Sequence, residues 1–474
     1  MKTSRARTIL ILIFVTYLFA NQTAVGWLYV IDGLLMALYI ISYFWPRRMV
    51  KHLTARRNFA VFANPDDSEG APTPVEPTVA KWLDAAAPLT FNEGEKLRVT
   101  LEIENVSRST KYFLEIWERF LPASLTERRQ KFFITYLKGR DAVRLNYDLL
   151  CDRRGLYQLP VPRVESAAPF GLFRRRRDLA LTQAVLVYPH YFEPKQFPLR
   201  RPENVTFTAE ARVGPGTDIY GTREYRQGDS LRHIHWPSSA RAQKLIVKEF
   251  EQVISSPITI LLDLERASLA GAGKQTTLEY SIKLAASVAF YATRVGHPVH
   301  LVGRSPSLSF SQMALPWPEI LDLLARAQAD GDTPLADLLD QLPANATLFV
   351  PVPRPDAQIL ECLLELRRHR MLVTAVLFDF ASFGSYISPE MEEAQADRAA
   401  KPLRFGLLGP LLLPKAFKPA AGTKSLQATQ TFLANEALNE WEGRLHREGI
   451  MTARCAKDSQ LETVLESFTS RVAR

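Results

Sequence analysis

The sequence predicts a multidomain protein: an N-terminal transmembrane helical hairpin, then an all-β sandwich, then a doubly wound α/β domain. Three observations indicate this order. The stretch from Thr8 to Trp45 is apolar and carries one charged side chain, Asp32. Between residues 97 and 149, apolar and polar residues alternate with the period of half-buried strands. Beyond residue 256, buried strands alternate with amphipathic helices, which is typical of a parallel sheet covered on both faces.

Length and charge narrow the classes of protein that fit. A chain of 474 residues exceeds the usual limit of a single core, so two or three domains are expected. Its 47% hydrophobic and 10% aromatic residues are enough to fill such cores. The net charge of +9 favours a polyanionic partner, either nucleic acid or an anionic membrane surface. Much of the charge lies in two clusters: Arg47, Arg48, Lys51, Arg56 and Arg57, and the run Arg174 to Arg177.

The three cysteines, Cys151, Cys362 and Cys455, are far apart and form no CxxC pair. We therefore expect neither a disulfide framework nor a structural zinc site. A reducing compartment fits this cysteine usage.

Residues 1–50 form the predicted hairpin. The apolar stretch is too long for one span and just long enough for two of about 17 to 25 residues, with ANQT at residues 20–23 as the polar break. Basic residues flank both ends, which is the positive-inside pattern of a hairpin with both termini in the cytosol. If only the second apolar segment spans the membrane, the basic cluster after it still places the C-terminal part of the chain in the cytosol. A cleaved signal peptide that ends near Ala20 or Ala24 is the third alternative. Asp32 is either a functional intramembrane acid or a polar group that faces the other helix.

Residues 51–205 form the predicted sandwich, which includes a Pro- and acid-rich linker, Ala63 to Pro77. Short strands separated by turns predict an antiparallel sandwich of immunoglobulin-like type, a domain that usually binds or spaces rather than catalyses. The expected strands are residues 96–105, 112–118, 131–137, 142–150, 155–164 and 184–188. The run Arg174 to Arg177 is expected to be a solvated loop, with contact to anionic lipid headgroups as the alternative.

Residues 256–474 form the predicted α/β domain, whose ligand sites are expected at the carboxyl ends of the strands. Its expected strands lie in residues 257–264, 298–303, 346–352 and 371–380. Its expected helices are residues 277–296, ended by Gly296, then 316–329, 356–370 and 425–448, and one after Asp458. The Pro-rich segment 384–424 has no clear periodicity and no assigned role.

Between these domains, residues 206–255 contain YGTREYRQGDSLRHIHWPSSARAQKLIVKEFE, from Tyr220 to Glu251. The pattern indicates an extended segment, a tight turn at Gly228 and Asp229, and a second strand. We expect an ion-pair network of Asp229 with nearby arginines, and burial of the rings of Tyr225 and Trp236. This favours a structural joint between two domains, with a docking surface as the compatible alternative. The network candidates are Arg223, Arg226 and Arg232.

This stretch resembles the signature of the bacterial domain-of-unknown-function-58 family, which joins a β-sandwich to a von Willebrand factor A-like domain. The matching positions are Arg223, Tyr225, Gly228, Asp229, Arg232, Ile234, Trp236, Ser239, Ala240, Arg241, Leu245, Val247, Lys248, Glu249 and Phe250, and we add Arg226 and His235 as site candidates. RRGLYQLP and SAAPFGLF upstream resemble two further family motifs, although Ala168 replaces an expected Asp. Because members of the family commonly accompany MoxR-type AAA+ ATPases, the resemblance implies such a partner.

Specific chemical functions for these residues are less favoured than a structural role. His233 and His235 lie on one face of an extended segment but lack further ligands except Asp229, so a metal site is not favoured. A Ser238 or Ser239 nucleophile with His235 and Asp229 lacks a nucleophile elbow such as G-x-S-x-G. Stacking of bases on Tyr225 and Trp236 is less common than packing at a joint. GAGKQT at residues 271–276 fails as a phosphate loop because Gln275 follows Lys274.

The von Willebrand resemblance implies a D-x-S-x-S metal site at the end of the first strand of the α/β domain. This chain keeps Asp263 but has Glu265 and Ala267 in place of both serines. Since the hydroxyl ligands are missing, we expect a degenerate site with no tight Mg²⁺ and no other metal or cofactor.

The sequence thus favours a membrane-anchored, non-catalytic scaffold that works with an AAA+ ATPase in protein assembly or maturation. Its expected place is the bacterial cytoplasmic (inner) membrane, as a multi-pass protein with its soluble domains in the cytosol. No nucleic-acid partner is expected. A metal-dependent hydrolase and a nucleic-acid-binding membrane protein remain the alternatives.

Overall fold

The computed structural model describes residues 4–23, 25–62, 73–74, 88–199, 219–226, 234–250, 257–306, 314–339, 342, 347–369, 371–388, 391–392 and 436–472. The chain divides into two compact units. The first contains the N-terminal helices and the β-rich region up to His190, and the second contains the parallel sheet. Each unit is described by itself.

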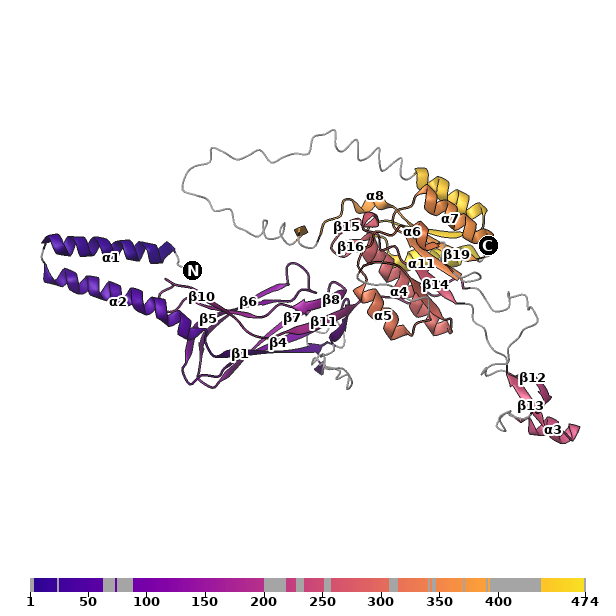
Figure 1. The fold of residues 1–474 in the computed structure, drawn as a ribbon, viewed down its shortest axis with the longest axis horizontal. Helices are drawn as coiled ribbons and strands as arrows, with labels where there is room; N and C mark the ends of the chain where they lie inside the picture. Colours follow the sequence, from indigo (N-terminus) through magenta and orange to yellow (C-terminus); the bar gives the residue numbers. More distant parts are fainter. Residues whose placement is uncertain are drawn as a thin grey trace. The chain divides into compact units, whose positions relative to one another are not determined.

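Two antiparallel helices open the first unit, α1 (Ser4–Thr23) and α2 (Gly26–Met49), and they lie side by side in Figure 1. Both are long and apolar enough to cross a membrane. The hydroxyl of Thr16 on α1 donates a hydrogen bond to Asp32 on α2 over 3.0 Å. Asp32 therefore faces the other helix, as one of the two sequence alternatives stated.

Three sheets build the β-rich region. The first contains, in spatial order, β2 (Thr73–Pro74), β1 (Leu53–Val61), β4 (Lys96–Asn105) and β7 (Ala142–Leu150). The second contains β10 (Arg175–Asp178), β9 (Arg163–Ser166), β5 (Lys111–Arg119) and β6 (Arg129–Leu137). The third contains β3 (Leu89–Asn92), β11 (Gln183–Tyr188) and β8 (Gly155–Leu159), with β3 and β11 parallel.

The alternation read from the sequence matches burial in these strands. On β4, Leu97, Val99, Leu101 and Ile103 are fully buried, and they divide between two apolar cores of the β-rich region. The strand expected over residues 155–164 is instead two strands, β8 and β9, because Pro160 and Pro162 interrupt it. The strands β1 and β3 were not expected.

The arginine run is not a loop, which corrects the sequence expectation. Residues Arg175–Asp178 form β10, which pairs antiparallel with β9. The guanidinium of Arg176 lies 2.8 Å from Glu165, and that of Arg175 lies over the ring of Tyr43 on α2, 5.3 Å from its centroid. Ion pairing and ring contact therefore hold these cations on an edge strand beside the helices.

The second unit is built on a five-stranded parallel sheet in the order β17 (Val299–Val302), β14 (Ile258–Leu261), β18 (Thr347–Val352), β19 (Leu372–Phe378) and β20 (Met451–Cys455). In chain order this is 2-1-3-4-5, an arrangement of doubly wound sheets. The expected parallel sheet is confirmed. The strand β20 was not expected.

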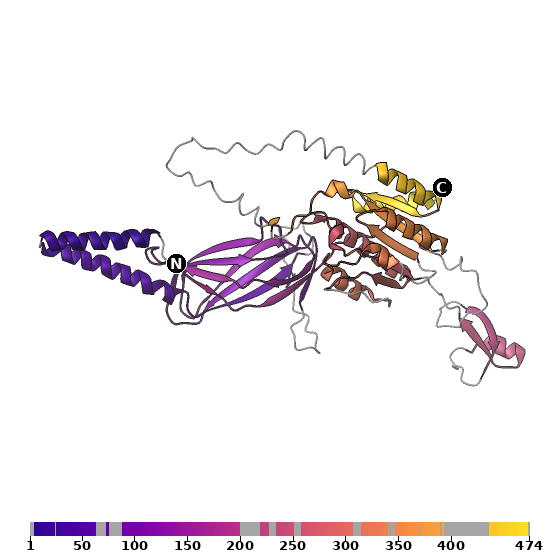
Figure 2. The ribbon, with the colours of Figure 1, turned by 45° about the horizontal axis from the view of Figure 1, so that its top comes forward.

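Helices cover the sheet, which Figure 2 displays from a second angle. They are α4 (Thr277–Val295), α5 (Trp317–Arg326), α6 (Leu335–Leu339), α7 (Ala357–Arg368), the short α8 (Phe380–Phe383), residues 436–447 and α11 (Leu461–Val472). The side chain of Thr276 caps the first turn of α4. Gly296 ends this helix in the left-handed conformation, and the sequence predicted this end. Residues 393–435, most of the Pro-rich segment, lie outside the described part of the chain.

The signature stretch contains an antiparallel pair, β12 (Ile219–Glu224) and β13 (Ile246–Phe250), with α3 (Trp236–Ala242) between them. Both expected extended segments are confirmed. Whether this stretch joins two domains stays a prediction.

Candidate functional site

The signature residues lie partly on the β12–α3–β13 element. Arg223 pairs with Val247 across the two strands, and the backbone N–H of Tyr225 donates to the carbonyl of Leu245 over 2.8 Å. Lys248 and Glu249 lie on β13, while His235, Trp236, Ser239 and Arg241 lie at or within α3. Gly228, Asp229, Arg232 and His233 lie outside the described residues, so the expected Asp229 network stays a prediction.

The histidine and serines of this stretch form a helix cap. His235 is the N-cap residue of α3, and its Nδ1 accepts from the backbone N–H of Ser238 and lies 2.7 Å from the Ser238 hydroxyl. The buried Ser239 hydroxyl donates to the carbonyl of His235 and accepts from the backbone N–H of Ile246 over 2.9 Å. These bonds satisfy the first turn of the helix and attach it to β13. A structural role therefore accounts for each of these groups.

Trp236 is exposed on this element, which corrects the expectation of a buried ring. It retains 65% of its accessible surface, whereas Ile234 and Val247 nearby are 4% exposed. Arg226 and Arg241 are also exposed, and Tyr225 is half-buried. An exposed indole at the first position of a helix is available for contact with a partner.

The second candidate region is the carboxyl end of the parallel sheet, where the strand order reverses between β17, β14 and β18. Asp263 follows β14 and is 3% exposed; its Oδ1 accepts from the backbone N–H of Glu265 over 2.9 Å. Burial raises the pKa of Asp263 to about 6, although bonds from Ser268 and Glu265 oppose this. Asp263 is therefore not available on the surface, while Glu265 is half-buried.

The residues around Asp263 give no further support to a metal centre. Within the described ranges, no group of three or more His, Cys, Asp or Glu side chains is placed to hold an ion. Asp356, the nearest additional carboxylate that affects Asp263, is the N-cap of α7 and accepts from the backbone N–H of Ile359 over 2.8 Å. Exposed cations on this end include Arg266, Arg304 and Arg354.

GAGKQT also has a structural explanation. Its residues form a two-stranded turn, β15 (Gly271–Ala272) and β16 (Gln275–Thr276), directly before α4. Gly271 and Gly273 both have positive φ, and a side chain at Gly271 would collide with the carbonyl of Gln275. The geometry of this turn therefore explains both glycines.

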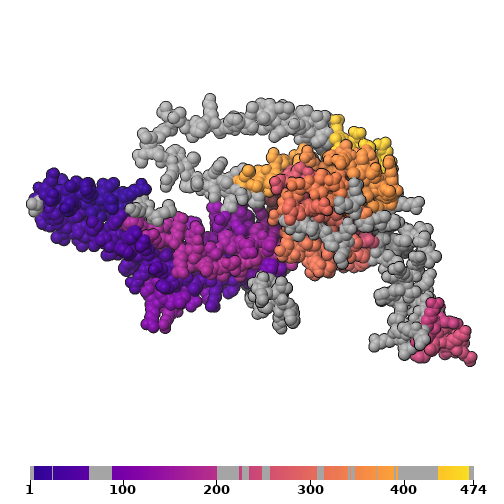
Figure 3. Space-filling model, viewed as in Figure 1, coloured from indigo at the N-terminus to yellow at the C-terminus, as the bar shows by residue number. Residues whose placement is uncertain are grey.

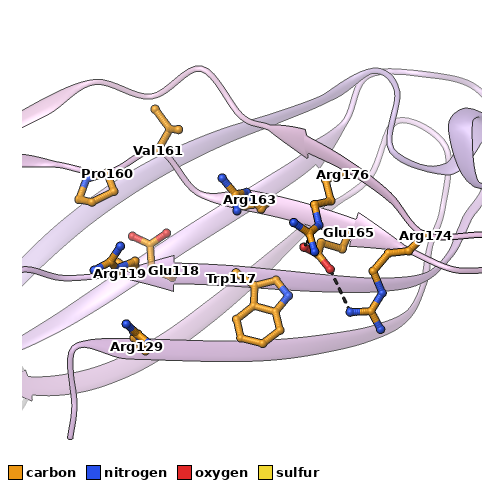
Figure 4. A pocket seen from close by; sticks show the side chains of 10 residues that line it. All are labelled: Trp117, Glu118, Arg119, Arg129, Pro160, Val161, Arg163, Glu165, Arg174 and Arg176. Atoms are coloured by element: carbon orange, nitrogen blue, oxygen red, sulfur yellow. Dashed lines mark hydrogen bonds and ion pairs between the residues drawn. The ribbon is translucent and has the colours of Figure 1, made fainter. Parts of the chain in front are cut away.

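Sequence reasoning missed an open cavity of about 500 Å³ on the outer face of the β10-β9-β5-β6 sheet. Figure 4 shows Trp117 and Arg119 of β5 beside Arg163 and Glu165 of β9. Its lining residues are Trp117, Glu118, Arg119, Arg129, Pro160, Val161, Arg163, Glu165, Arg174 and Arg176. The sequence could have indicated this shared surface, since alternation along β5 and β9 places Trp117, Arg119, Arg163 and Glu165 on one face.

Positive charge exceeds negative charge around this cavity. Five arginines line it, against two glutamates. Glu165 pairs with Arg174 and Arg176, and Glu118 is buried in an ion pair with Arg57 over 2.5 Å. Arginines around an indole ring are suited to anionic groups that also offer a flat or apolar part. The cavity is thus a candidate anion site.

Comparison with known proteins locates the signature stretch in a family. A profile of the family described as "Protein of unknown function DUF58" matches residues 221–309, about a fifth of the chain. The "Uncharacterized protein YeaD" of Bacillus subtilis (strain 168) is 25% identical over 124 residues, which are 26% of this chain and 31% of that protein. The match therefore spans less than a third of the relative's length.

Solved structures give only weak similarity. A β-glucosidase from Listeria innocua has 13% identity and a TM-score of 0.11, over 28% of this chain and 16% of that one. A GH20 exo β-N-acetylglucosaminidase from Vibrio harveyi has 9% identity and a TM-score of 0.18, over 70% of this chain and 48% of that one. Neither similarity is strong enough to support a functional argument.

Proposed function

We propose that the protein is a membrane-anchored, non-catalytic scaffold that works with a MoxR-type AAA+ ATPase in protein assembly or maturation. In this proposal α1 and α2 cross the bacterial cytoplasmic membrane, and the β-sandwich and the α/β domain lie in the cytosol. We also propose that the sandwich is of immunoglobulin-like type and that the α/β domain is a von Willebrand A-like domain with a degenerate metal site. The sheet order 2-1-3-4-5 and the position of Asp263 after the first strand support the latter.

One observation carries the proposal: the helices and the sandwich are joined by packing as well as by the chain. Met49 and Val50, at the end of α2, are buried in the same apolar core as Leu114 and Ile116 of β5. Phe173 packs edge-on against Tyr39 and Tyr43 of α2, with centroids 5.1 and 5.3 Å apart. In Figure 3 the base of the indigo hairpin is in contact with the sandwich. A joint of this kind suits a rigid support at the membrane.

The partner contact is proposed at the carboxyl end of the parallel sheet. Ligands of doubly wound sheets bind there, and the exposed Arg304 and Arg354 follow β17 and β18 at this end. Since Asp263 is buried, the contact rests on the exposed cations and on Glu265 rather than on a metal.

The test is co-purification of the full chain with a MoxR-type AAA+ ATPase of the same organism, from detergent extract. Arg354→Glu should weaken the complex, whereas Arg368→Glu should not, because these two exposed arginines lie at opposite ends of α7. Chelator should leave the complex intact. Loss of the complex on chelation alone would contradict the degenerate metal site, and equal effects of the two substitutions would contradict the proposed surface.

A further inference from the structure

The end of the sandwich nearest the helices is assembled from four segments that are distant in sequence: residues 51–52, 106–110, 138–141 and 167–174. We call this surface the proximal end. Asn105 is fully buried at its centre, and its side-chain amide donates to the carbonyls of Ser109 and Lys138 over 2.9 Å each. The backbone N–H of Val106 donates to His52, next to the end of α2. The proximal end is therefore a folded surface fixed beside the base of the hairpin.

This surface is strongly basic. Its exposed charged side chains are Lys51, Arg108, Lys138, Arg140 and Asp141, and the half-buried Arg174 adds one more cation. Four exposed cations thus accompany one exposed carboxylate, and Arg174 is paired with Glu165. Arg47 and Arg48 of α2 lie directly beside it, since the ammonium of Lys111 donates to the carbonyl of Arg48 over 2.8 Å. The tertiary fold thereby concentrates charge that the sequence distributes over more than 120 positions.

Apolar groups accompany the charge. In the loop before β10, Leu172 and Phe173 are buried against Ala6 and Ile9 of α1 and against Leu38, Tyr39 and Tyr43 of α2. Ala6 and Ile9 at the start of α1, and Tyr43 near the end of α2, lie where the hairpin's apolar stretch meets its basic flanks, which is the level of the membrane interface. Phe170 in the same loop is 53% exposed, and Phe113 and Tyr136 are 46% and 58% exposed. Exposed aromatic rings at this level are typical of side chains in the headgroup layer.

We propose that the proximal end binds the headgroup layer of an anionic phospholipid bilayer, with Phe170 at the interface and the basic loops on the lipid phosphates. The proposal rests on the membrane anchoring of the proposed function and adds the lipid class and the contact surface. Charge complementarity and continuity with the hairpin both favour this occupant. Bound in this way, the sandwich has a second attachment to the membrane besides its packing against the helices.

The experiment places the full chain in lipid nanodiscs that contain a lipid with a nitroxide on its headgroup, which quenches nearby fluorophores. A thiol-reactive fluorophore is attached at Val106→Cys, on the proximal end, or at Thr126→Cys, in the loop at the other end of β5 and β6. Cys151 and Cys455 are buried, and the chain without an added cysteine gives the labelling background. The discs contain phosphatidylcholine alone or mixed with phosphatidylglycerol.

We expect quenching at Val106 and not at Thr126, and stronger quenching at Val106 in the anionic discs. Because each basic residue at an anionic surface contributes roughly a fivefold factor, Arg108→Gln/Lys138→Gln should reduce the ratio of bound to unbound proximal ends by on the order of tenfold or more. The matched variant Lys96→Gln/Lys131→Gln removes two cations from the ends of β4 and β6 that lie away from the proximal end, and it should change nothing.

Different results would contradict the membrane anchoring and the headgroup contact. If the chain does not enter nanodiscs, the anchoring is wrong and the lipid contact with it. If the chain enters but quenching at Val106 is the same in both lipid mixtures, or if both double variants act alike, the anchoring stands and the headgroup contact is overturned.

Discussion

The side chain of Lys111, which is 1% exposed, donates a hydrogen bond from its ammonium to the carbonyl oxygen of Arg48 over 2.8 Å. Lys111 begins β5 and Arg48 lies in the last turn of α2, whose terminal carbonyls have no partner within the helix. A buried cation thus caps α2 and fixes it to the β-rich region. Burial lowers the pKa of Lys111, and the nearby Arg48 adds to this effect.

Replacing Lys111 should loosen this junction. Lys111→Met keeps most of the buried stem but leaves the carbonyl of Arg48 without its charged donor, a loss of about 1.5 to 3 kcal/mol. We expect faster limited trypsin cleavage at Arg47, Arg48 and Lys51. Lys131→Met, on the exposed face of β6, is the control. Equal cleavage rates in the two variants would show that the hydrogen bond does not hold the junction.

The sandwich should gain stability on mild acidification. Burial raises the pKa of Glu118 from its usual 4.5 to about 6, although Arg57 opposes this. A carboxyl whose folded pKa lies above its unfolded value contributes stability that is full below pH 4.5 and is lost as the pH rises through 6. Unfolding free energy should therefore rise between pH 7 and pH 5, by at most about 2 kcal/mol from this group. Glu118→Gln should remove this part of the pH dependence in chemical denaturation, and an unchanged profile would contradict the assignment.

Removal of Arg57 from the same ion pair should strongly lower the unfolding free energy. Both side chains of Arg57 and Glu118 are fully buried. Arg57→Met leaves Glu118 buried without its partner and should cost about 3 to 5 kcal/mol of unfolding free energy. The double variant Arg57→Met/Glu118→Met should recover most of this loss, since it removes both charges. If the double variant is as unstable as the single one, the ion pair stabilises the fold beyond offsetting the cost of burying its two charges.

Trp236→Ala should affect binding rather than stability. Because the residue is 65% exposed, its removal should change the unfolding free energy by less than about 1 kcal/mol. Ser239→Ala should instead destabilise the α3–β13 contact, because it removes the bonds to His235 and Ile246. Hydrogen exchange on β12, α3 and β13 checks both expectations. Loss of protection in Trp236→Ala would restore a structural role for the indole.

The sequence predicted strands and helices well where the pattern was local. The alternation on β4, and the boundaries of α4 at Thr276 and Gly296, follow from side-chain period and capping chemistry. The strand β1 was missed because Arg57 occupies a buried position on it. Arg57 can be buried there because it pairs with Glu118 on β5, a contact that the local sequence pattern does not show.

The sites were harder to predict than the strands. In the arginine run, the sequence indicated a solvated loop because four adjacent cations seldom form a strand, and Glu165 on β9 supplies the compensation. The exposure of Trp236 and the burial of Asp263 depend on long-range packing that a motif does not encode. The basic proximal end arises only when loops around residues 51, 108 and 138 meet at Asn105.

The orientation of the chain in the membrane tests the central claim most directly. A reporter enzyme active only outside the cytosol is fused after Thr23, between α1 and α2, or after Arg474 at the C-terminus. The account predicts activity for the first fusion and none for the second, because the basic flanks keep both ends of the hairpin in the cytosol. Strong activity of the C-terminal fusion would contradict the anchored cytosolic scaffold.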